Sequence, residues 1–210
     1  MSQRAAPAAT DQRPARGRRS SSRRNEILAS AAKLFAQQGY RPTTLTELAE
    51  AIGIAKATLF HHFRTKEQIL FELYAQAMDL ALARLAAVDD PGRDPADVVR
   101  EMVREHTLVI LQNKALFTIF FDEESGLEPE HLAKVKDQQR DYINLISRRV
   151  SELIAAGRVR GGVHPRIAVQ ALLGAGSWTY RWVESGRDLT DEQIADMIAA
   201  LTLDGLVREP

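Results

Sequence analysis

The decapeptide ATLFHHFRTK, residues 57–66, holds the densest group of side chains in this chain that could do chemistry. Two adjacent histidines, His61 and His62, lie between phenylalanines and precede Arg64 and Lys66. Such a group suits a metal site, an acid and base pair, or a surface that contacts phosphate. The elements that position these residues decide between the three kinds of site.

A metal site is the weakest of the three interpretations. Adjacent residues on a helix point about 100° apart, and neither histidine has a His or carboxylate partner four residues away on its own face. The chain has no cysteine, which excludes thiolate ligands, thiolate nucleophiles and disulfides. No nucleophile elbow and no paired acid and base are present. The sequence therefore predicts no metal site, no cofactor and no enzyme.

Helical periodicity places the decapeptide after two earlier helices. From Ser22 onward the apolar residues form one stripe, and Gly39 follows its end as a C-terminal cap. Thr44 and Glu47 then form the pattern of a capping box, which satisfies two backbone N–H groups at the start of a helix. Gly53 ends that second helix after about two turns.

A third short helix begins almost at once and carries the decapeptide. Leu59 and Phe63 are four residues apart, so both are expected to face inward. A short helix, a turn containing Gly and a second short helix form a helix-turn-helix, whose second helix fits a DNA major groove. The outward positions of this second helix are small or polar and suit base edges or phosphates: Lys56, Ala57, Thr58 and His61.

The remainder of the chain also reads as helical. Thr65 and Gln68 form a second capping box, which opens a long amphipathic helix that stops near Asp89. No later stretch alternates with a period of two, so we expect an all-α protein with an N-terminal three-helix unit and a larger C-terminal bundle. The further helices are expected at residues 95–113, 115–121, 129–156, 165–184 and 190–204.

Charge is unevenly distributed, although the formal net charge is +0. Residues 1–66 carry twelve Lys or Arg and four Asp or Glu, and the remainder is acidic. We expect a flexible basic arm at 1–21, a helix-turn-helix domain at 22–65, and a ligand-binding and dimerisation domain at 66–210. No apolar run approaches the roughly 20 residues of a membrane span, and no signal peptide is visible. No membrane contact and a cytoplasmic location are expected.

The stretch TTLTELAEAIGIAKATLFHHFRTKEQIL, with ILASAAKLFAQQGY before it, resembles the DNA-binding region of the TetR family of bacterial transcriptional regulators. The similarity covers about residues 24–72. It implies a homodimeric repressor that binds double-stranded operator DNA through this region. A small effector in the C-terminal domain would release the DNA. A DNA-binding protein that responds to no effector is an alternative.

The resemblance assigns DNA contacts position by position. Thr43 and Thr44 stand at the start of the supporting helix, where hydroxyl and N–H groups can hold a phosphate. Lys56, Ala57 and Thr58 occupy the segment that faces the bases. Among these three residues, Lys56 is the best candidate for reading a guanine edge.

The resemblance also implies contacts to the DNA backbone. His61 and Lys66 match positions that bind phosphate in the family, Lys66 together with the positive end of its helix. Family members usually have Tyr where this chain has Phe60, so one polar contact worth about 1 kcal/mol is missing. Four arginines could compensate in the minor groove: Arg18, Arg19, Arg23 and Arg24.

The segment LLGAGSWTYRWVESGRDLTDEQIADMIAALTLDGL, residues 172–206, is similar to the end of TetR-family regulators that respond to coenzyme A thioesters. This similarity implies an acyl-CoA effector. A different hydrophobic effector, or an enzyme acting on acyl thioesters, is the alternative. The candidate effector residues are Phe117, Phe120, Phe121, Arg140, Arg148, Trp178 and Trp182.

The physical reading of these residues leaves alternatives open. The phenylalanines suit an acyl or aromatic group, or simply a core. The arginines suit CoA phosphates, or are ordinary solvated charges. The tryptophans can line a pocket and still find a polar partner. Small residues at 174–177 and an apolar stripe on the last helix predict an intersubunit four-helix bundle: Ile194, Met197, Ile198 and Leu201.

Overall fold

The computed structural model describes residues 15–184 and 188–207, and these residues fold almost entirely into helices. One isolated antiparallel bridge joins Val159 to Val207. The all-α prediction is therefore confirmed. The elements are α1 (Ala15–Gln38), α2 (Leu45–Ile52), α3 (Lys56–His62), α4 (Lys66–Val88), α5 (Pro95–Gln112), α6 (Lys114–Asp122), η1 (Glu124–Gly126), α7 (Pro129–Ala155), α8 (Pro165–Ser177), α9 (Thr179–Trp182) and α10 (Asp191–Leu206).

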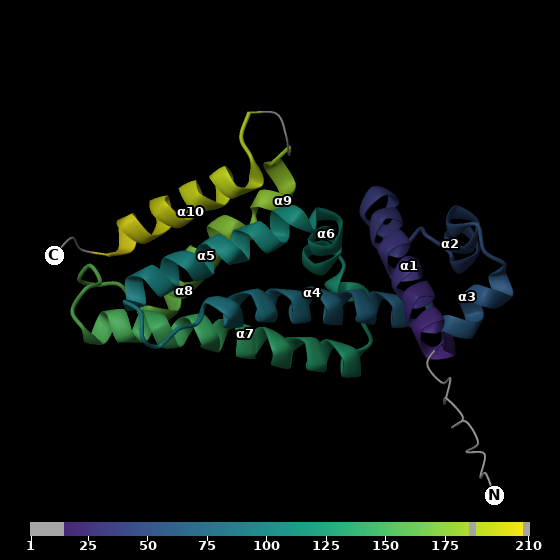
Figure 1. Cartoon of the computed structure of the whole chain (residues 1–210), viewed down its shortest axis with the longest axis horizontal. Helices are drawn as coiled ribbons and strands as arrows, with labels where there is room; N and C mark the ends of the chain where they lie inside the picture. Colours follow the sequence, from purple (N-terminus) through teal and green to yellow (C-terminus); the bar gives the residue numbers. More distant parts are fainter. Residues whose placement is uncertain (1–14, 185–187, 208–210) are drawn as a thin grey trace, which may run out of the picture.

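The helices form two parts that share α4 (Figure 1). Helices α1, α2 and α3 gather at one end of the molecule, around the first turns of α4. Helices α5 and α7 pack along the remainder of α4, and α8 and α10 pack on the α5 side of this layer. Helix α6 lies between the two parts, because it contacts both α1 and α4. Helices α4 and α6 therefore connect the N-terminal part to the C-terminal part.

The helix boundaries differ from the prediction by more than two residues at two places. Helix α1 begins at Ala15 rather than Ser22, so the end of the expected arm is helical. No proline follows Pro14 in this stretch, and Arg and Ala favour helix. The first part of the arm, residues 1–14, lies outside the described residues. The expected helix at 165–184 divides at Trp178, where the hydroxyl of Thr179 donates to the Gly176 carbonyl at 2.7 Å.

The caps predicted from the sequence set the ends of the N-terminal helices. The Thr44 and Glu47 capping box is present at the start of α2. The second predicted box is only half formed: the Thr65 hydroxyl accepts from the Gln68 N–H, but the Gln68 side chain accepts from the Arg64 N–H at 3.1 Å instead of from Thr65. Gly53 adopts the left-handed conformation with φ of 72° and ends α2. Leu59 and Phe63 are fully buried as predicted, so α3 is fixed with its opposite face in solvent.

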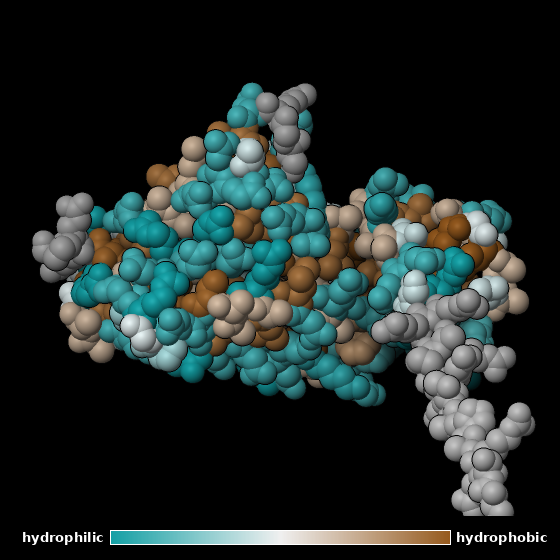
Figure 2. All heavy atoms as spheres, viewed as in Figure 1, coloured by the Kyte–Doolittle hydropathy of each residue, from teal (hydrophilic) through white to brown (hydrophobic). Residues whose placement is uncertain are grey.

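Most of the surface in Figure 2 is hydrophilic, with apolar side chains reaching it between the two parts and along α10. Within the described residues, we find no helix with both the length and the apolar character of a membrane span.

Candidate DNA-binding surface and effector pocket

Helix α3 presents most of the predicted DNA contacts on one exposed face. Lys56, Ala57, Thr58, Phe60 and His61 are all exposed. The Lys56 ammonium lies 5.7 Å from the centroid of the Phe60 ring, which places a cation beside an apolar surface. Phe60 is 40% exposed, an unusual position for a large apolar ring. The structure therefore brings these side chains together on a face that is free to contact another molecule.

The two threonines before α2 have different environments. The Thr43 side chain is buried, and its hydroxyl donates to the Gly39 carbonyl at 2.8 Å and accepts from the Gln38 amide at 3.0 Å. The predicted phosphate contact by the Thr43 hydroxyl is therefore wrong. Thr44 is exposed and caps α2 through the Glu47 backbone N–H.

Lys66 does not offer its charge to solvent. Its ammonium donates to the carbonyls of Tyr40, Arg41 and Thr43 at 2.7, 2.9 and 2.8 Å. Burial lowers the pKa of Lys66, and the carboxylates of Glu123 and Glu47 act in the opposite direction. An ammonium has three N–H donors, and all three are used. The predicted phosphate role is therefore replaced by a structural one, the clamping of the turn between α1 and α2.

Arg24 is likewise bound within the protein rather than extended toward DNA. Its guanidinium pairs with Glu72, donates to the His62 carbonyl at 2.8 Å, and stacks over the Phe63 ring at 4.2 Å. It ties α1 to the end of α3, so its predicted minor-groove role is corrected. Arg23 is exposed and pairs with Glu26 on the same helix at 2.7 Å. An exposed ion pair of this kind is weak, so it can be broken when DNA binds. Arg23 therefore remains a candidate for the minor-groove contact.

The two histidines have separate environments. His61 is exposed, whereas His62 is partly buried. Burial, followed by the charges of His61, Arg24 and Arg23, lowers the pKa of His62. The rings lie edge to face with centroids 5.4 Å apart. Within the described part of the chain, no group of three or more His, Asp or Glu side chains is placed to hold a metal ion.

A close contact joins α6 to the turn that Lys66 clamps. Glu123, just after α6, accepts a hydrogen bond from the Tyr40 backbone N–H at 3.0 Å. A Cβ added to Gly126 would lie 2.7 Å from a Tyr40 ring carbon and 2.8 Å from a Leu70 methyl carbon. Only glycine permits this approach. The end of α6 is therefore fitted tightly against the DNA-binding part.

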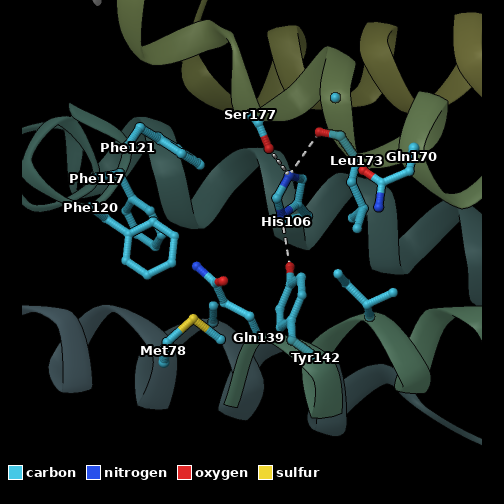
Figure 3. Close-up of a pocket in the computed structure, with 13 residues that line it drawn as sticks. Met78, His106, Phe117, Phe120, Phe121, Gln139, Tyr142, Gln170, Leu173 and Ser177 are labelled. Carbon is cyan, nitrogen blue, oxygen red and sulfur yellow. Dashed lines mark hydrogen bonds between the residues drawn. The ribbon is translucent and has the colours of Figure 1, made fainter. Parts of the chain in front are cut away.

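Helices α4 to α8 line a half-open cavity of about 380 Å³ (Figure 3). The predicted aromatic cluster of α6 forms one end of it, since Phe117, Phe120 and Phe121 all line the cavity. Rings 120 and 121 pack edge to face at 5.4 Å. The other lining residues are mostly apolar or uncharged: Met78, Ala81, His106, Gln139, Tyr142, Ile143, Gln170, Leu173, Gly174 and Ser177.

A hydrogen-bonded group forms the polar corner of this cavity. His106 Nδ1 lies 2.7 Å from the Tyr142 hydroxyl, and Nε2 lies 3.0 Å from the Leu173 carbonyl and 3.1 Å from the Ser177 hydroxyl. A carbonyl only accepts, so Nε2 carries the hydrogen and Nδ1 accepts from Tyr142. Burial lowers the pKa of His106 to about 4, with a smaller opposing effect from the Leu173 carbonyl. His106 is therefore neutral near pH 7.

Sequence reasoning missed this polar corner. The available signal was a lone histidine on the apolar face of α5, four residues after Met102 and four before Ile110. A histidine in such a position is commonly a satisfied core residue, so the sequence does not identify a binding group. The partners Tyr142 and Ser177 come from α7 and α8, which only the tertiary structure brings to α5.

Four of the predicted effector residues lie outside the cavity. Arg140 pairs with Asp137 on exposed α7, and Arg148 lies 3.3 Å from Asp89 beside a separate shallow hollow. Trp178 and Trp182 are 59% and 58% exposed. The predicted pocket roles of these two arginines and two tryptophans are therefore corrected. The reason is helical phase, which turns the tryptophans away from α5.

Trp178 belongs instead to an apolar face formed by α8 and α10. Ile167 on α8 and Trp178, which directly follows α8, are exposed on the same side as Gly174, and on α10 Met197 and Leu201 are exposed. The two helices are in contact, and a groove between them is lined mainly by apolar and small residues. A Cβ added to Gly174 would meet no atom within 4 Å. This face has room for another helix to approach.

The neutral, buried state of His106 predicts acid sensitivity. Its folded pKa of about 4 lies below the unfolded value of 6.5, so between these values the unfolded chain binds more protons. The contribution of neutral His106 to the free energy of unfolding is therefore complete above pH 6.5 and decreases below it. At pH 5 the free energy of unfolding should be about 2 kcal/mol lower than at pH 7. Urea denaturation at pH 7 and pH 5 measures the loss, and His106→Gln should remove most of this difference. An equal pH dependence in both proteins would contradict the assignment.

Comparison with known proteins agrees with both parts of the structure. The family model described as "Bacterial regulatory proteins, tetR family" matches residues 27–73, and the one described as "Tetracyclin repressor-like, C-terminal domain" matches residues 92–206. Among characterised relatives, the HTH-type transcriptional repressor KstR2 of Mycobacterium tuberculosis is 26% identical over 189 residues. That match covers 90% of this chain and 94% of the relative.

Solved structures agree as well. The ketosteroid transcriptional regulator KstR2 of Mycobacterium tuberculosis has a TM-score of 0.82 at 26% identity, covering 89% of this chain and 96% of that one. AibR in complex with isovaleryl coenzyme A and operator DNA has a TM-score of 0.77 at 31% identity, covering 85% and 97%. Both family models fall on the parts that the helices define. This chain therefore belongs to the TetR family of bacterial transcriptional regulators rather than to a family of enzymes.

Proposed function

We propose that this protein is a homodimeric repressor that binds operator DNA through α3 and releases it when an acyl-CoA thioester occupies the cavity. One observation carries the proposal. Helix α6 lines the cavity with Phe117, Phe120 and Phe121 and is followed at once by Glu123, which accepts from the backbone N–H of Tyr40 in the DNA-binding part. An effector that displaces α6 therefore acts directly on the turn that precedes α2.

The chemistry of the cavity supports an acyl group as the buried portion of the effector. Its lining includes three phenylalanines and no Lys, Arg, Asp or Glu among the described residues. A charged CoA moiety would remain outside, with only the acyl end desolvated. AibR, a structural neighbour, is described in complex with isovaleryl coenzyme A and operator DNA. The alternative is a different hydrophobic effector without CoA.

Release of operator DNA tests this function. We expect a saturating acyl-CoA of medium chain length to weaken operator binding about tenfold, within the 5–150-fold range of allosteric coupling. The operator is first selected from a random DNA library by binding to the protein. Fluorescence anisotropy of the labelled operator then measures its affinity with and without the acyl-CoA. Phe120→Asp should abolish the response while leaving binding of DNA alone intact. Reciprocity requires that operator DNA weaken acyl-CoA binding equally, and a panel of acyl-CoA thioesters without either effect would refute the proposal.

The exposed phenylalanine of α3 gives a gain-of-function prediction. Phe60→Tyr adds one hydroxyl at the edge of the proposed DNA contact, so operator affinity should rise up to about tenfold, as expected for one polar contact. Titration of operator DNA at fixed salt measures the change. Phe71→Tyr, on α4 and away from α3, is the matched control and should leave DNA affinity unchanged. Weaker binding by Phe60→Tyr would place this ring outside the interface.

A further inference from the structure

The polar corner of the cavity has more hydrogen-bonding capacity than its internal contacts use. Tyr142 gives its hydroxyl hydrogen to His106 Nδ1, which leaves the phenolic oxygen free to accept. Ser177 accepts from His106 Nε2 and keeps its own hydrogen to donate. Both side chains line the cavity (Figure 3). One donor and one acceptor therefore stand side by side at one end of the cavity, whose other polar side chains are the uncharged amides of Gln139 and Gln170.

We infer that the portion of the effector inside the cavity carries an uncharged oxygen, a keto or hydroxyl group, to which Ser177 donates. Tyr142 can accept in addition from a hydroxyl group, and His106 positions both side chains. This inference deepens the proposed function by naming the class of acyl group. A keto oxygen accepts from Ser177, and a hydroxyl can also donate to Tyr142. A saturated hydrocarbon would leave both groups without a partner, at the cost of a desolvated polar group.

The charge of the lining excludes other oxygen-bearing groups. A free carboxylate inside the cavity would have no cationic partner among the described lining residues, and an amine would have no anionic one. An unpaired buried ion is far more costly than a buried hydroxyl. Burial also keeps His106 neutral, because it lowers the pKa of that ring to about 4. The selected group is therefore polar but not ionised.

The packing of α8 on α5 holds the donor in place. A Cβ added to Gly176 would lie 2.5 Å from the Thr107 hydroxyl oxygen and 2.8 Å from a His106 ring carbon. Thr107 in turn donates to the Val103 carbonyl at 2.9 Å and is fully buried. The contact fixes α8 one residue before Ser177. The donor is thus built into a rigid junction rather than carried on a mobile loop.

The size of the cavity sets the size of the acyl group. At roughly 30 Å³ for each water-sized group, about 380 Å³ holds on the order of ten non-hydrogen atoms. A cyclohexanecarbonyl group that carries one keto oxygen as a substituent on the ring has that size. Cyclohexanecarbonyl-CoA and its 3-oxo and 4-oxo derivatives are therefore suitable probes, because they differ only in the presence and position of the oxygen.

The experiment compares ligands and variants in one cycle. Isothermal titration of the full chain should show an oxo derivative binding five- to tenfold more tightly than the parent thioester, as one polar contact predicts. Ser177→Ala should remove most of this preference, because Ser177 donates to the keto oxygen. Tyr142→Phe should remove less of it, because the Tyr142 hydrogen is already given to His106 and none is left for a keto group. Ile143→Val, an apolar change in the same lining, should leave the preference intact. Far-ultraviolet circular dichroism checks that each variant is folded.

The outcomes separate this inference from the proposed function. The same acyl groups are also titrated as methyl esters, which lack CoA. A preference for the oxo esters that depends on Ser177, without any binding of the CoA thioesters, supports the oxygen site and refutes the acyl-CoA effector. Operator release by CoA thioesters with no preference for oxygen supports the effector and overturns the oxygen site. Binding of no probe in either form also overturns the oxygen site.

Discussion

Lys66→Met is expected to destabilise the DNA-binding part by about 3 kcal/mol, from three charge-assisted hydrogen bonds to partly solvated carbonyls. The ammonium reaches the carbonyls of Tyr40, Arg41 and Thr43, which close the turn between α1 and α2. Methionine has a similar length but no donor, so these carbonyls lose their partner. Urea denaturation monitored by circular dichroism measures the loss, and operator affinity should fall more than tenfold with it.

The control is Lys33→Met, which removes one charge from an exposed position on α1. It should change stability by less than 0.5 kcal/mol, as is usual for surface positions. Salt dependence separates the two roles that Lys66 could have. A phosphate contact would lower the salt slope of DNA binding by about one and leave stability unchanged. That result would restore the contact implied by the family resemblance.

Leu201→Glu is expected to convert the homodimer to monomers and to reduce operator affinity at least a hundredfold. Leu201 is 77% exposed, so the charge is solvated in a free protomer. In the proposed dimer the apolar faces of α8 and α10 meet the same faces of the partner subunit. Twofold symmetry then buries two carboxylates in one interface, and each unpaired charge costs several kcal/mol.

Analytical ultracentrifugation across a range of protein concentrations measures this effect. The matched control is Ala133→Glu, which adds the same charge at an exposed position of α7. Circular dichroism should show both variants equally helical. A dimer of Leu201→Glu as tight as that of the unchanged protein would show that α10 does not form the interface.

Local patterns in the sequence were sufficient for the helices and their caps. The capping residues Thr44 and Thr65 and the turn at Gly53 act within one turn of their own helix, so their effect does not depend on distant residues. The same holds for the phase of α3, in which Leu59 and Phe63 face inward and Lys56 faces outward. The all-α class and the exposure of the face proposed to contact DNA follow from this local order.

The hydrogen-bond and ion-pair partners of charged side chains were not predictable in the same way. Lys66 and Arg24 have the types and positions of phosphate ligands, yet their charges are taken by backbone carbonyls and by Glu72. Those partners are separated from them by 23 residues or more along the chain. Formal charge identifies a side chain that needs a partner, but not which partner it finds.

The C-terminal part shows the same division. The sequence alone determined that α6 carries an aromatic cluster and that the last helices carry apolar stripes. Only the tertiary structure decided that Phe117, Phe120 and Phe121 line a cavity whereas Trp178 and Trp182 face solvent. Periodicity fixes which residues share a face of one helix. The neighbour of that face depends on how α5, α7 and α8 pack together, and the same packing assembles the polar corner around His106.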